Sequence, residues 1–415
     1  MREMKDSGIE WIGDIPVSWK IMPNKYLMRK EKKICPVYHG EDILSLTMKG
    51  VIVRDLDAGG KMPTSFDGYQ RLEVGNLLMC LFDIDVTPRC VGLIKQAGVS
   101  SPAYSQFVLR KGADAAYYCY YYTMLDNDKT LLHLAKNLRH SLTEDQLGAI
   151  PVIVPPIEEQ QRIADFLDTK CAEIDALTAD IQTQIDTLEQ YKRSVITETV
   201  TKGLDPDAEM KDGGIEWIGQ MPSSWSIVPN KYLMYKIKSV CPVYNGENIL
   251  SLTTNGVIIR DLNGGGKMPT SFDGYQKVVP GNLLMCLFDI DVTPRCIGLI
   301  KNFGLTSPAY SQFVMKDGAY APYYHYYYLM VDYTKELLHM AKNLRHSLTE
   351  DQLGAIKAPK PPYDEQIQIA EYLDNKCSKI GRTIADKNNQ LAILEEYKKS
   401  LIFEYVTGKK EVPTS

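Results

Sequence analysis

The stretch "PPIEEQQRIADFLDTKC" occupies residues 155–171, and a close copy, "PPYDEQIQIAEYLDNKC", occupies residues 361–377. The offset between them is 361 − 155 = 206 residues, and the same offset relates further segments without any gap. These segments are "MKDSGIEWIG" at 4–13, "GKMPTSFDGYQ" at 60–70, "GNLLMCLFDIDVTPRC" at 75–90 and "AKNLRHSLTEDQLGAI" at 135–150. Solenoid repeats are about 20–50 residues long, so a repeat of this length predicts two copies of a whole domain.

The quoted stretch also predicts the start of a long helix. Pro155 and Pro156 suit a helix N-terminus, and Glu158 and Glu159 in the first turn favour the helix dipole. Apolar residues then recur at near-heptad intervals between polar ones, which is typical of a coiled-coil seam. The seam residues expected to bind a partner are Ile163, Leu167, Ile174, Ile181 and Leu188, with Ile369, Leu373, Ile380, Ile384 and Leu391. About 40 helical residues would extend ~60 Å, and the obvious partner for such a seam is its own copy.

The residues before each helix mix short strand-like runs, such as Val51–Val53, Leu77–Phe82 and Ile150–Val154, with Gly, Pro and Asp turns. We therefore expect an α+β fold in which two α/β domains are separated by two long antiparallel coiled-coil-like helices, with a pseudo-twofold internal repeat. The expected boundaries are 1–155 and 210–361 for the domains, 156–202 and 362–408 for the helices, and 203–209 for the linker. The tyrosine clusters at 117–122 and 323–330 could stack on bases, but we expect core-facing helices there.

Composition points to an ordinary globular chain of 415 residues with 44% hydrophobic residues and a net charge of −5. The start, "MREMKDSGIEW", lacks the apolar run of a signal peptide, and no apolar stretch approaches the ~20 residues of a membrane span. Nine cysteines without a C-x-x-C pair suggest reduced thiols in the cytoplasm. Residues 157–202 hold 5 basic and 10 acidic residues (5 − 10 = −5), whereas residues 1–150 hold 19 and 18 (19 − 18 = +1). The helix is therefore an unlikely place for DNA.

Two segments resemble catalytic or cofactor-binding motifs, but neither fits the motif fully. "GGGKM" at 264–268 lacks the Ser or Thr of a phosphate loop, and "PDAEMK" at 206–211 crowds its carboxylates into a linker, where two-metal chemistry cannot use them. Asp83 and Asp85, repeated as Asp289 and Asp291, could bind a metal, but a turn or an ion pair with Arg89 is the favoured interpretation. We expect a non-catalytic chain with no metal and no cofactor of its own.

Three repeated motifs resemble a known family. "SGIEWIGDIPVSWK" at 7–20, "DGYQRLEVGNLLMCLFDID" at 67–85 followed by "SPAYSQF", and the segment from Arg139 to Asp175 are similar to the specificity subunit of type I restriction–modification systems. Each occurs twice, so the resemblance covers essentially the whole chain. It implies two target-recognition domains held apart by two antiparallel helices.

The resemblance also implies partners. Members of this family assemble with two methyltransferase subunits, which bind S-adenosylmethionine and modify adenine N6, and with two restriction subunits, which use ATP and Mg. The expected partners of this chain are therefore double-stranded DNA and those subunits, with no membrane. Two rival interpretations stay open: the specificity subunit of another methylation-linked defence system, and a coiled-coil scaffold that binds no DNA.

Candidate DNA contacts come from loops rich in the side chains that read groove edges or position phosphates. The favoured set is the loop before the capping-box-like Thr143 and Gln146, and the second set belongs to the "GKMPTSFDGYQ" phrase. The first comprises Lys136, Asn137, Arg139, His140 and Ser141, with Lys342, Asn343, Arg345, His346 and Ser347. The second comprises Lys61, Ser65, Tyr69 and Gln70, with Lys267, Ser271, Tyr275 and Gln276, and Arg54, Arg89, Arg260 and Arg295 complete the candidates. A purely structural role for either loop stays open.

The candidates match between the copies residue for residue, which predicts equal half-sites. If a pseudo-twofold axis relates the copies, each meets the duplex in the inverted sense, and the target is a bipartite palindrome with an unspecified spacer. We expect the half-sites about one DNA turn apart, ~34–36 Å between centres. Three differences could break this symmetry: Arg29 against Tyr235, Glu31 against Ile237, and Glu73 against Val279.

Overall fold

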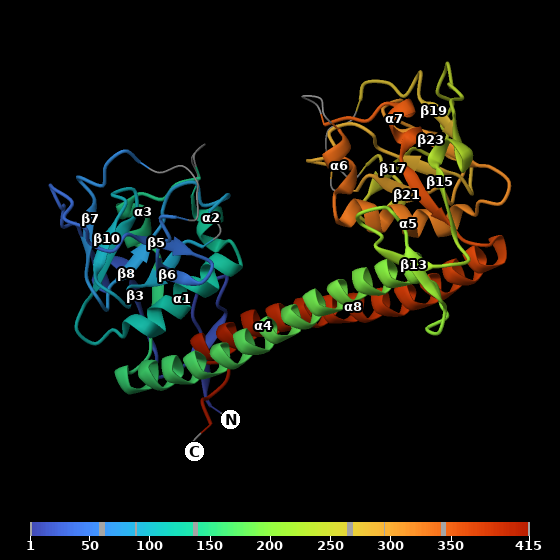
Figure 1. Ribbon diagram of the computed structural model, residues 1–415. Coiled ribbons are helices and arrows are strands. Elements are labelled where there is room, and N and C mark those ends of the chain that lie inside the picture. The colour runs from blue at the N-terminus through green and yellow to red at the C-terminus, as the bar shows by residue number, and fades with distance from the viewer. Residues whose placement is uncertain are drawn as a thin grey trace. The chain divides into compact units, whose positions relative to one another are not determined.

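The computed structural model describes residues 2–57, 63–87, 89–135, 140–263, 269–293, 295–341 and 346–413. The chain forms two compact units, one made of Met1–Ile181 with Asn388–Ser415 and the other of Gln182–Lys387. Each unit combines one copy of the repeat with parts of both long helices, so these units do not follow the linear boundaries expected from the sequence. Those boundaries stay a prediction. Figure 1 traces the elements of each unit along the chain.

The first unit is built on short antiparallel strands followed by helices. A four-stranded sheet runs in the order β4-β11-β8-β9, and the other strands form the pairs β1-β2, β3-β12, β5-β6 and β7-β10. The strands are β1 Met4–Asp6, β2 Asp14–Pro16, β3 Lys20–Pro23, β4 Met28–Glu31, β5 Leu44–Thr47, β6 Gly50–Val53, β7 Gln70–Leu72, β8 Leu77–Met79, β9 Val91–Leu93, β10 Gly98–Ser100, β11 Ser105–Leu109 and β12 Pro151–Val154. The helices are η1 Asn24–Tyr26, α1 Ala115–Asn127, α2 Thr130–Leu134, α3 Glu144–Ala149 and α4 Ile157–Lys202, the last of which continues into the second unit.

The second unit repeats this plan, with the sheet order β16-β23-β20-β21 and the pairs β13-β14, β15-β24, β17-β18 and β19-β22. Its strands are β13 Met210–Asp212, β14 Gln220–Pro222, β15 Ser226–Pro229, β16 Met234–Ile237, β17 Leu250–Thr253, β18 Gly256–Ile259, β19 Gln276–Val278, β20 Leu283–Met285, β21 Ile297–Leu299, β22 Gly304–Thr306, β23 Ser311–Met315 and β24 Lys357–Lys360. Its helices are η2 Asn230–Tyr232, α5 Ala321–Tyr333, α6 Glu336–Met340, α7 Glu350–Ala355 and α8 Tyr363–Val406. The expected α+β fold, with two domains joined by long helices, is confirmed.

The tyrosine clusters form the core of each unit, as expected. Tyr117, Tyr118, Tyr121 and Tyr122 of α1 are completely buried, and their equivalents on α5 are similarly enclosed. Each buried hydroxyl needs a hydrogen-bond partner. The Tyr122 hydroxyl donates to Oδ1 of Asn24 at 2.6 Å, for example, and the Tyr118 hydroxyl donates to the carbonyl oxygen of Ile153 at 3.1 Å. Stacking on bases is therefore excluded for these four rings.

The "PPIEEQ" motif fixes the start of α4 to its domain. Trp19 donates from Nε1 to Glu159 at 2.9 Å, and the buried Gln160 donates to the carbonyl oxygens of Pro155 and Gly112 at 2.8 and 3.2 Å. Gln160 also accepts a hydrogen bond from the amide of Asp114 at 2.8 Å, at the start of α1. The second unit has the same bonds, from Trp225 and Gln366, which explains why this short motif recurs almost unchanged.

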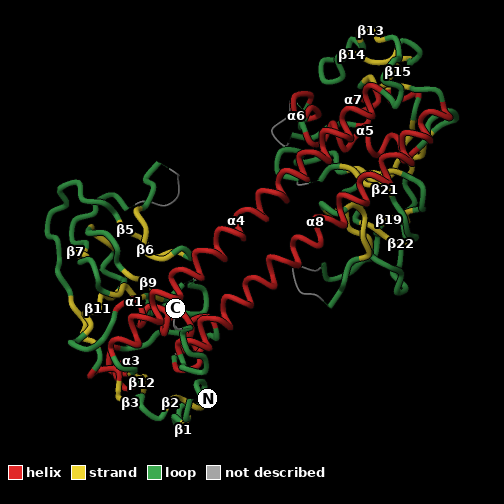
Figure 2. The backbone as a smooth tube through the Cα atoms, turned by 90° about the horizontal axis from the view of Figure 1, so that it is seen from below, coloured by secondary structure: helices red, strands yellow, loops and turns green. Residues whose placement is uncertain are grey.

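Within each unit the two long helices pack against each other, and Figure 2 shows each of them as an unbroken helix. In the first unit the ring centroids of Phe166 and Tyr405 lie 4.4 Å apart, and Lys398 forms a 2.6 Å ion pair with Asp175. Residue numbers rise along α4 while they fall along α8, so the helices are antiparallel there. In the second unit Lys387 of α8 donates to Gln184 of α4.

No helix of the described ranges is long and apolar enough to cross a membrane.

The predicted seam residues are covered by this chain itself. Ile163, Leu167 and Ile174 lie in the core of the first unit, Ile369 and Leu373 lie in that of the second, and Ile181 and Ile380 are also buried. Leu188, Ile384 and Leu391 are half-buried. The seam therefore joins the copies to each other, and direct contact of these ten side chains with a separate protein stays a prediction.

Candidate nucleic-acid interface

The loop between β8 and β9, here called the β8–β9 loop (residues 80–87), adopts an unusual backbone. Asp83 has a φ of 47° and His140, which lies beside it, has a φ of 43°; the second unit repeats this with Asp289 at 46° and His346 at 42°. Non-glycine residues rarely take positive φ, and such strain concentrates at functional sites. Both copies have this strained backbone, so it is a regular feature of the fold.

Of the two expected alternatives at Asp83 and Asp85, the turn is present, whereas Arg89 forms its ion pair with Asp126. Oδ2 of Asp85 lies 3.0 Å from Nδ1 of His140, and Oδ2 of Asp291 lies 2.9 Å from Nδ1 of His346. The hydrogen bond from His140 lowers the pKa of Asp85. Strand β8 ends at Met79, before the turn, so the two aspartates do not share a strand face.

The segment that follows residues 136–139 is fastened to this loop. The His140 carbonyl oxygen accepts from the amide of Ile84 at 3.1 Å, and the amide of Leu142 donates to Leu81 at 2.8 Å. The predicted capping box of Thr143 and Gln146 is present at the start of the six-residue α3. His140 is exposed, whereas His346, Ser141 and Ser347 are half-buried. The other predicted contacts of this set, Lys136, Asn137, Arg139, Lys342, Asn343 and Arg345, lie outside the described residues.

The second set, in the "GKMPTSFDGYQ" phrase, forms a loop that bonds to itself and to its neighbours. Oγ of Ser65 accepts from the amide of Asp67 at 3.1 Å, and Asp67 accepts from the amide of Tyr38 at 2.8 Å. The bond from Tyr38 is the main cause of the lowered pKa of Asp67. Gly68 has a φ of 76°, which suits glycine. Ser271 repeats the bond of Ser65 at 3.0 Å, Tyr69 and Tyr275 are half-buried, and Lys61 and Lys267 lie outside the described residues.

The two glutamines of the phrase point into the fold. Gln70 is 1% exposed, and its Nε2 donates to the carbonyl oxygens of Ser101 and Tyr104 at 2.9 and 2.8 Å. Gln276 makes the same pair of bonds, to Ser307 and Tyr310 at 3.0 and 2.5 Å. These amides stabilise the adjoining turn, and the predicted contact with a base would require both bonds to open. The repeat of this motif is thus explained by a turn that both copies form with the same hydrogen bonds.

A second structural feature, which the sequence did not reveal, is an exposed β-hairpin in each unit. In the first unit β5 and β6 form a two-stranded ribbon whose Leu46 and Val51 lie so close to Gly92 of β9 that a Cβ there would meet both at 2.8 Å. Because strand side chains alternate, the neighbouring Ile52 faces away, and it is 40% exposed. Ile258 of the β17–β18 hairpin is the equivalent, at 42%. The sequence signal for this face was an isoleucine two residues before Arg54 and before Arg260.

Several contacts bring these segments together in the first unit. The charge of Arg54, which follows β6, opposes the rise that burial causes in the pKa of Tyr104. Tyr104 in turn accepts the bond from Gln70, and its ring lies 6.3 Å from that of Phe82 in the β8–β9 loop. Hairpin, phrase and loop are therefore neighbours, and the same loop holds His140 through Asp85.

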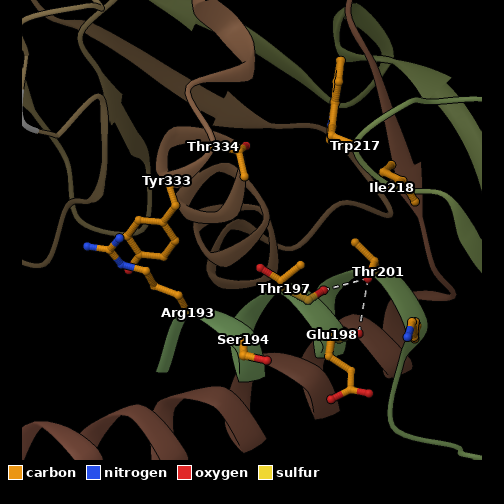
Figure 3. A pocket seen from close by; sticks show the side chains of 10 residues that line it. Arg193, Ser194, Thr197, Glu198, Thr201, Trp217, Ile218, Tyr333 and Thr334 are labelled. Carbon is orange, nitrogen blue, oxygen red and sulfur yellow. Dashed lines mark hydrogen bonds between the residues drawn. The ribbon is translucent and has the colours of Figure 1, made fainter. Parts of the chain in front are cut away.

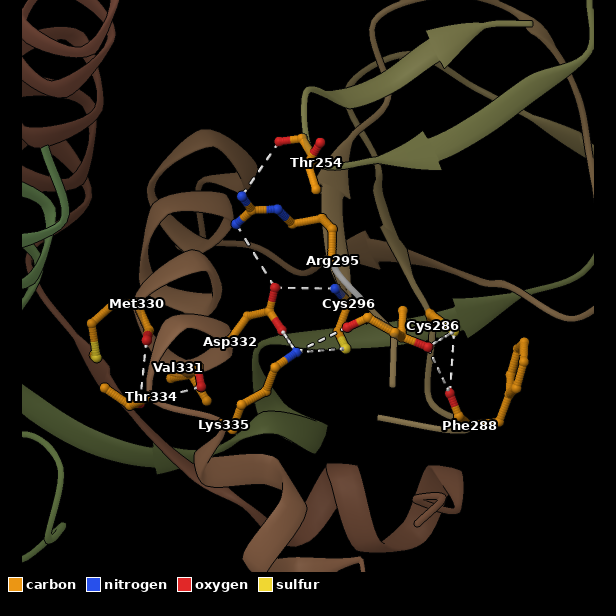
Figure 4. Close-up of polar contacts among 11 residues, drawn as sticks. Thr254, Cys286, Phe288, Arg295, Cys296, Met330, Val331, Asp332, Thr334 and Lys335 are labelled. Atoms are coloured by element: carbon orange, nitrogen blue, oxygen red, sulfur yellow. Dashed lines mark hydrogen bonds and ion pairs between the residues drawn. The ribbon is translucent and has the colours of Figure 1, made fainter. Parts of the chain in front are cut away.

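The two other predicted arginines are largely buried. Arg89 donates to Asp126 and Asn127 of α1 at 3.4 and 3.0 Å. Figure 4 shows the corresponding cluster in the second unit, where Asp332 lies 3.7 Å from Arg295, accepts from the amide of Cys296 at 3.1 Å and accepts from Lys335 at 3.0 Å. A reach from Arg89 or Arg295 to a base would leave a buried carboxylate with fewer partners, which is costly. Within the described residues, no group of three or more His, Cys, Asp or Glu could hold a metal ion.

The three differences expected to break the symmetry lie close together. Lys33 pairs with Glu31 at 3.7 Å and with Glu73, and Arg29 lies 3.4 Å from Glu31. In the second unit Tyr235, Ile237 and Val279 replace this charged network, and Tyr235 and Val279 are exposed. The copies therefore present different chemistry here while the hairpins and loops stay almost identical.

Comparison with known proteins agrees with this architecture. Residues 91–187 match the family model of the type I restriction modification DNA specificity domain. The specificity subunit of the type I restriction enzyme MjaVIII from Methanocaldococcus jannaschii is 25% identical over 284 residues, which cover 63% of this chain and 63% of that protein. The match thus spans less than two thirds of the relative's length.

A solved structure extends the likeness over nearly the whole fold. It is a chain from a study of complex assembly and conformational transition of the type I R-M system, with a TM-score of 0.71 at 13% identity. The superposition covers 95% of this chain and 99% of that chain, which shows a shared fold. The repeated motifs, the two units and the matched specificity domain thus make this chain similar to the specificity subunits of type I restriction–modification systems.

Proposed function

We propose that this chain is the DNA-recognition subunit of a type I restriction–modification complex and performs no chemistry itself. The observation that carries the proposal is the paired face: each unit presents the same exposed hairpin beside the same strained loop. Ile52 and Ile258 occupy equivalent places on these hairpins, and Asp83 and Asp289 share the same positive φ. A protein that reads two half-sites needs two such faces.

The chemistry of the face suits duplex DNA. A two-stranded ribbon fits the major groove, where apolar side chains contact the methyl group of thymine and arginine reads guanine. Ile52 lies on such a ribbon and Arg54 follows directly after its strand β6, with Ile258 and Arg260 as their counterparts. The hydrogen bonds from Gln70 and the contact between Asp85 and His140 hold the neighbouring turns in place, which lowers the ordering cost of binding.

Partners supply the reactions in this proposal. Two methyltransferase subunits would bind S-adenosylmethionine and modify adenine N6, and two restriction subunits would use ATP and Mg. Helix α4, residues 157–202, carries a net charge of 5 − 10 = −5. Its acidic surface therefore suits contact with a protein better than contact with DNA phosphates. The isolated chain should therefore neither methylate nor cut DNA.

The test uses the full chain with its methyltransferase partner and DNA that carries the methylated target. Ile52→Glu combined with Ile258→Glu puts one negative charge on each exposed hairpin face. We expect at least a tenfold loss of DNA affinity, because the charges meet phosphates. Val17→Glu is the matched control: Val17 is 41% exposed, away from the hairpins in sequence, and the second copy has a polar Ser223 there. Equal DNA binding by the double variant and the control would overturn the proposed face.

A further inference from the structure

The two units differ at a residue that contacts a buried arginine. At the end of α1, Oδ1 of Asn127 accepts a hydrogen bond from Arg89 at 3.0 Å. At the end of α5 the equivalent residue is Tyr333, whose ring centre lies 5.0 Å from the guanidinium of Arg295. A tyrosine ring attracts a cation over its face but offers no amide oxygen. The two arginines therefore have different partners.

Arg295 also reaches the hairpin, through its other terminal nitrogen. Its Nη2 donates to the carbonyl oxygen of Thr254 at 3.3 Å, at the turn between β17 and β18, as Figure 4 shows. Arg89 bonds only to α1 residues within the described part of the first unit, so its hairpin turn at Met48 has no such tie. Arg295 is 14% exposed on its side chain, and Asp332 holds its other end at 3.7 Å, so the arginine is well placed to act as a fixed link.

The ring of Tyr333 is itself held from the long helix. The guanidinium of Arg193 on α4 lies 5.1 Å from the ring centre, at the edge of a pocket of about 540 Å³ that Figure 3 shows. In the first unit the residue equivalent to Arg193 is Lys399 of α8, which pairs with Glu395 and Glu396. Only in the second unit, among the described residues, does a chain of contacts run from a long helix through an aromatic ring to the hairpin turn.

We infer that Tyr333 is a positioning residue that holds the β17–β18 hairpin of the second unit through Arg295. A hairpin that is held before binding loses less conformational freedom when DNA arrives. The consequence, which rests on the proposed function, is that the second unit binds its half-site more tightly than the first unit binds an identical half-site. Because the two units have the same candidate base-contacting residues, they would prefer the same DNA sequence but bind it with different affinity.

The first arm of the test needs no DNA. Hydrogen exchange is measured on the full chain for wild type, Tyr333→Asn and Tyr333→Phe. We expect Tyr333→Asn, which installs the first copy's residue, to speed exchange of the β17–β18 amides about three- to tenfold, because it removes a cation–π contact and frees Arg295 to turn back. Tyr333→Phe keeps the ring and should resemble wild type. Hairpin β5–β6 of the same molecule is the internal control.

Two outcomes of this arm would overturn the inference. One is unchanged exchange at β17–β18 in Tyr333→Asn, and the other is equal acceleration throughout the second unit, which would mean a merely structural role. The second arm measures the binding of target DNA by the complex with the methyltransferase, where Tyr333→Asn should weaken affinity about three- to tenfold. If the wild-type complex binds no DNA, the proposed function fails, while the exchange result still decides the role of Tyr333.

Discussion

The hydroxyl group of Tyr117 donates a 2.8 Å hydrogen bond to the carbonyl oxygen of Val406, 289 residues later in the chain. Tyr323 makes the equivalent bond to the carbonyl oxygen of Val200, at 3.0 Å and 123 residues earlier. Each tyrosine helix thus packs on the end of the long helix that belongs to the other copy. Each unit therefore contains a helix end from the other copy of the repeat.

This exchange of helix ends predicts which unit a core substitution destabilises. Ile402 of α8 is buried in the first unit, and its equivalent, Ile196 of α4, is buried in the second. We expect Ile402→Ala to lower the free energy of unfolding of the first unit by about 2–5 kcal/mol, the usual cost of such a cavity. Ile196→Ala should do the same to the second unit. Hydrogen exchange, compared strand by strand, distinguishes the units.

The matched pair makes this test specific. In the chain, Ile402 follows the second copy and Ile196 follows the first, so linear domains predict the opposite assignment. Faster exchange in β20 and β23 after Ile402→Ala, with β8 and β11 unchanged, would refute the exchange of helix ends.

His325 predicts a pH effect on the stability of the second unit that has no counterpart at the equivalent position of the first unit. Burial, with help from the charges of Arg295 and Lys301, lowers the pKa of His325 to about 3. Nδ1 of His325 is enclosed without a hydrogen-bond partner, although the residue as a whole is only partly buried. Between pH 3 and about 6.5 the unfolded state therefore binds the extra proton. Stability is complete above the unfolded pKa and falls as the pH decreases, by at most about 1.4 kcal/mol for each pH unit.

The control is already present in the sequence, because Cys119 occupies the equivalent place in the first copy. His325→Cys should flatten the dependence of the second unit's unfolding free energy on pH between 4 and 7, measured by denaturant titration at each pH. A wild-type slope that persists in His325→Cys would assign the pH effect to other groups.

Substitution of Gln70 tests whether this residue stabilises the fold or contacts a base. Gln70→Leu leaves the carbonyl oxygens of Ser101 and Tyr104 without their donor, which should cost the first unit about 1–3 kcal/mol. Thermal unfolding measures this loss, and Ser65→Ala on the exposed part of the same phrase should cost much less. Full stability in Gln70→Leu together with an altered methylation sequence would restore Gln70 as a base reader.

Sequence reasoning succeeded where structure is periodic or duplicated. The seam of α4, with Ile163 and Leu167, and the buried face of the tyrosine helix follow from local spacing, so both could be predicted. The partner of Arg89 could not, because Asp126 lies 37 residues away on α1 and becomes its neighbour only when the chain folds. Only one strand of hairpin β5–β6, at Val51–Val53, was expected, because the outer face of the hairpin is defined only by its packing on Gly92.

The central claim is that two nearly equal faces read two equal half-sites. The most direct measurement maps methylated adenines across the genome of cells that carry this chain with its methyltransferase partner. We predict a bipartite target in which one short sequence is followed, after an unspecified spacer, by its reverse complement. Two unrelated half-sites would contradict the claim and would transfer specificity to the differing cluster around Glu31 and Ile237.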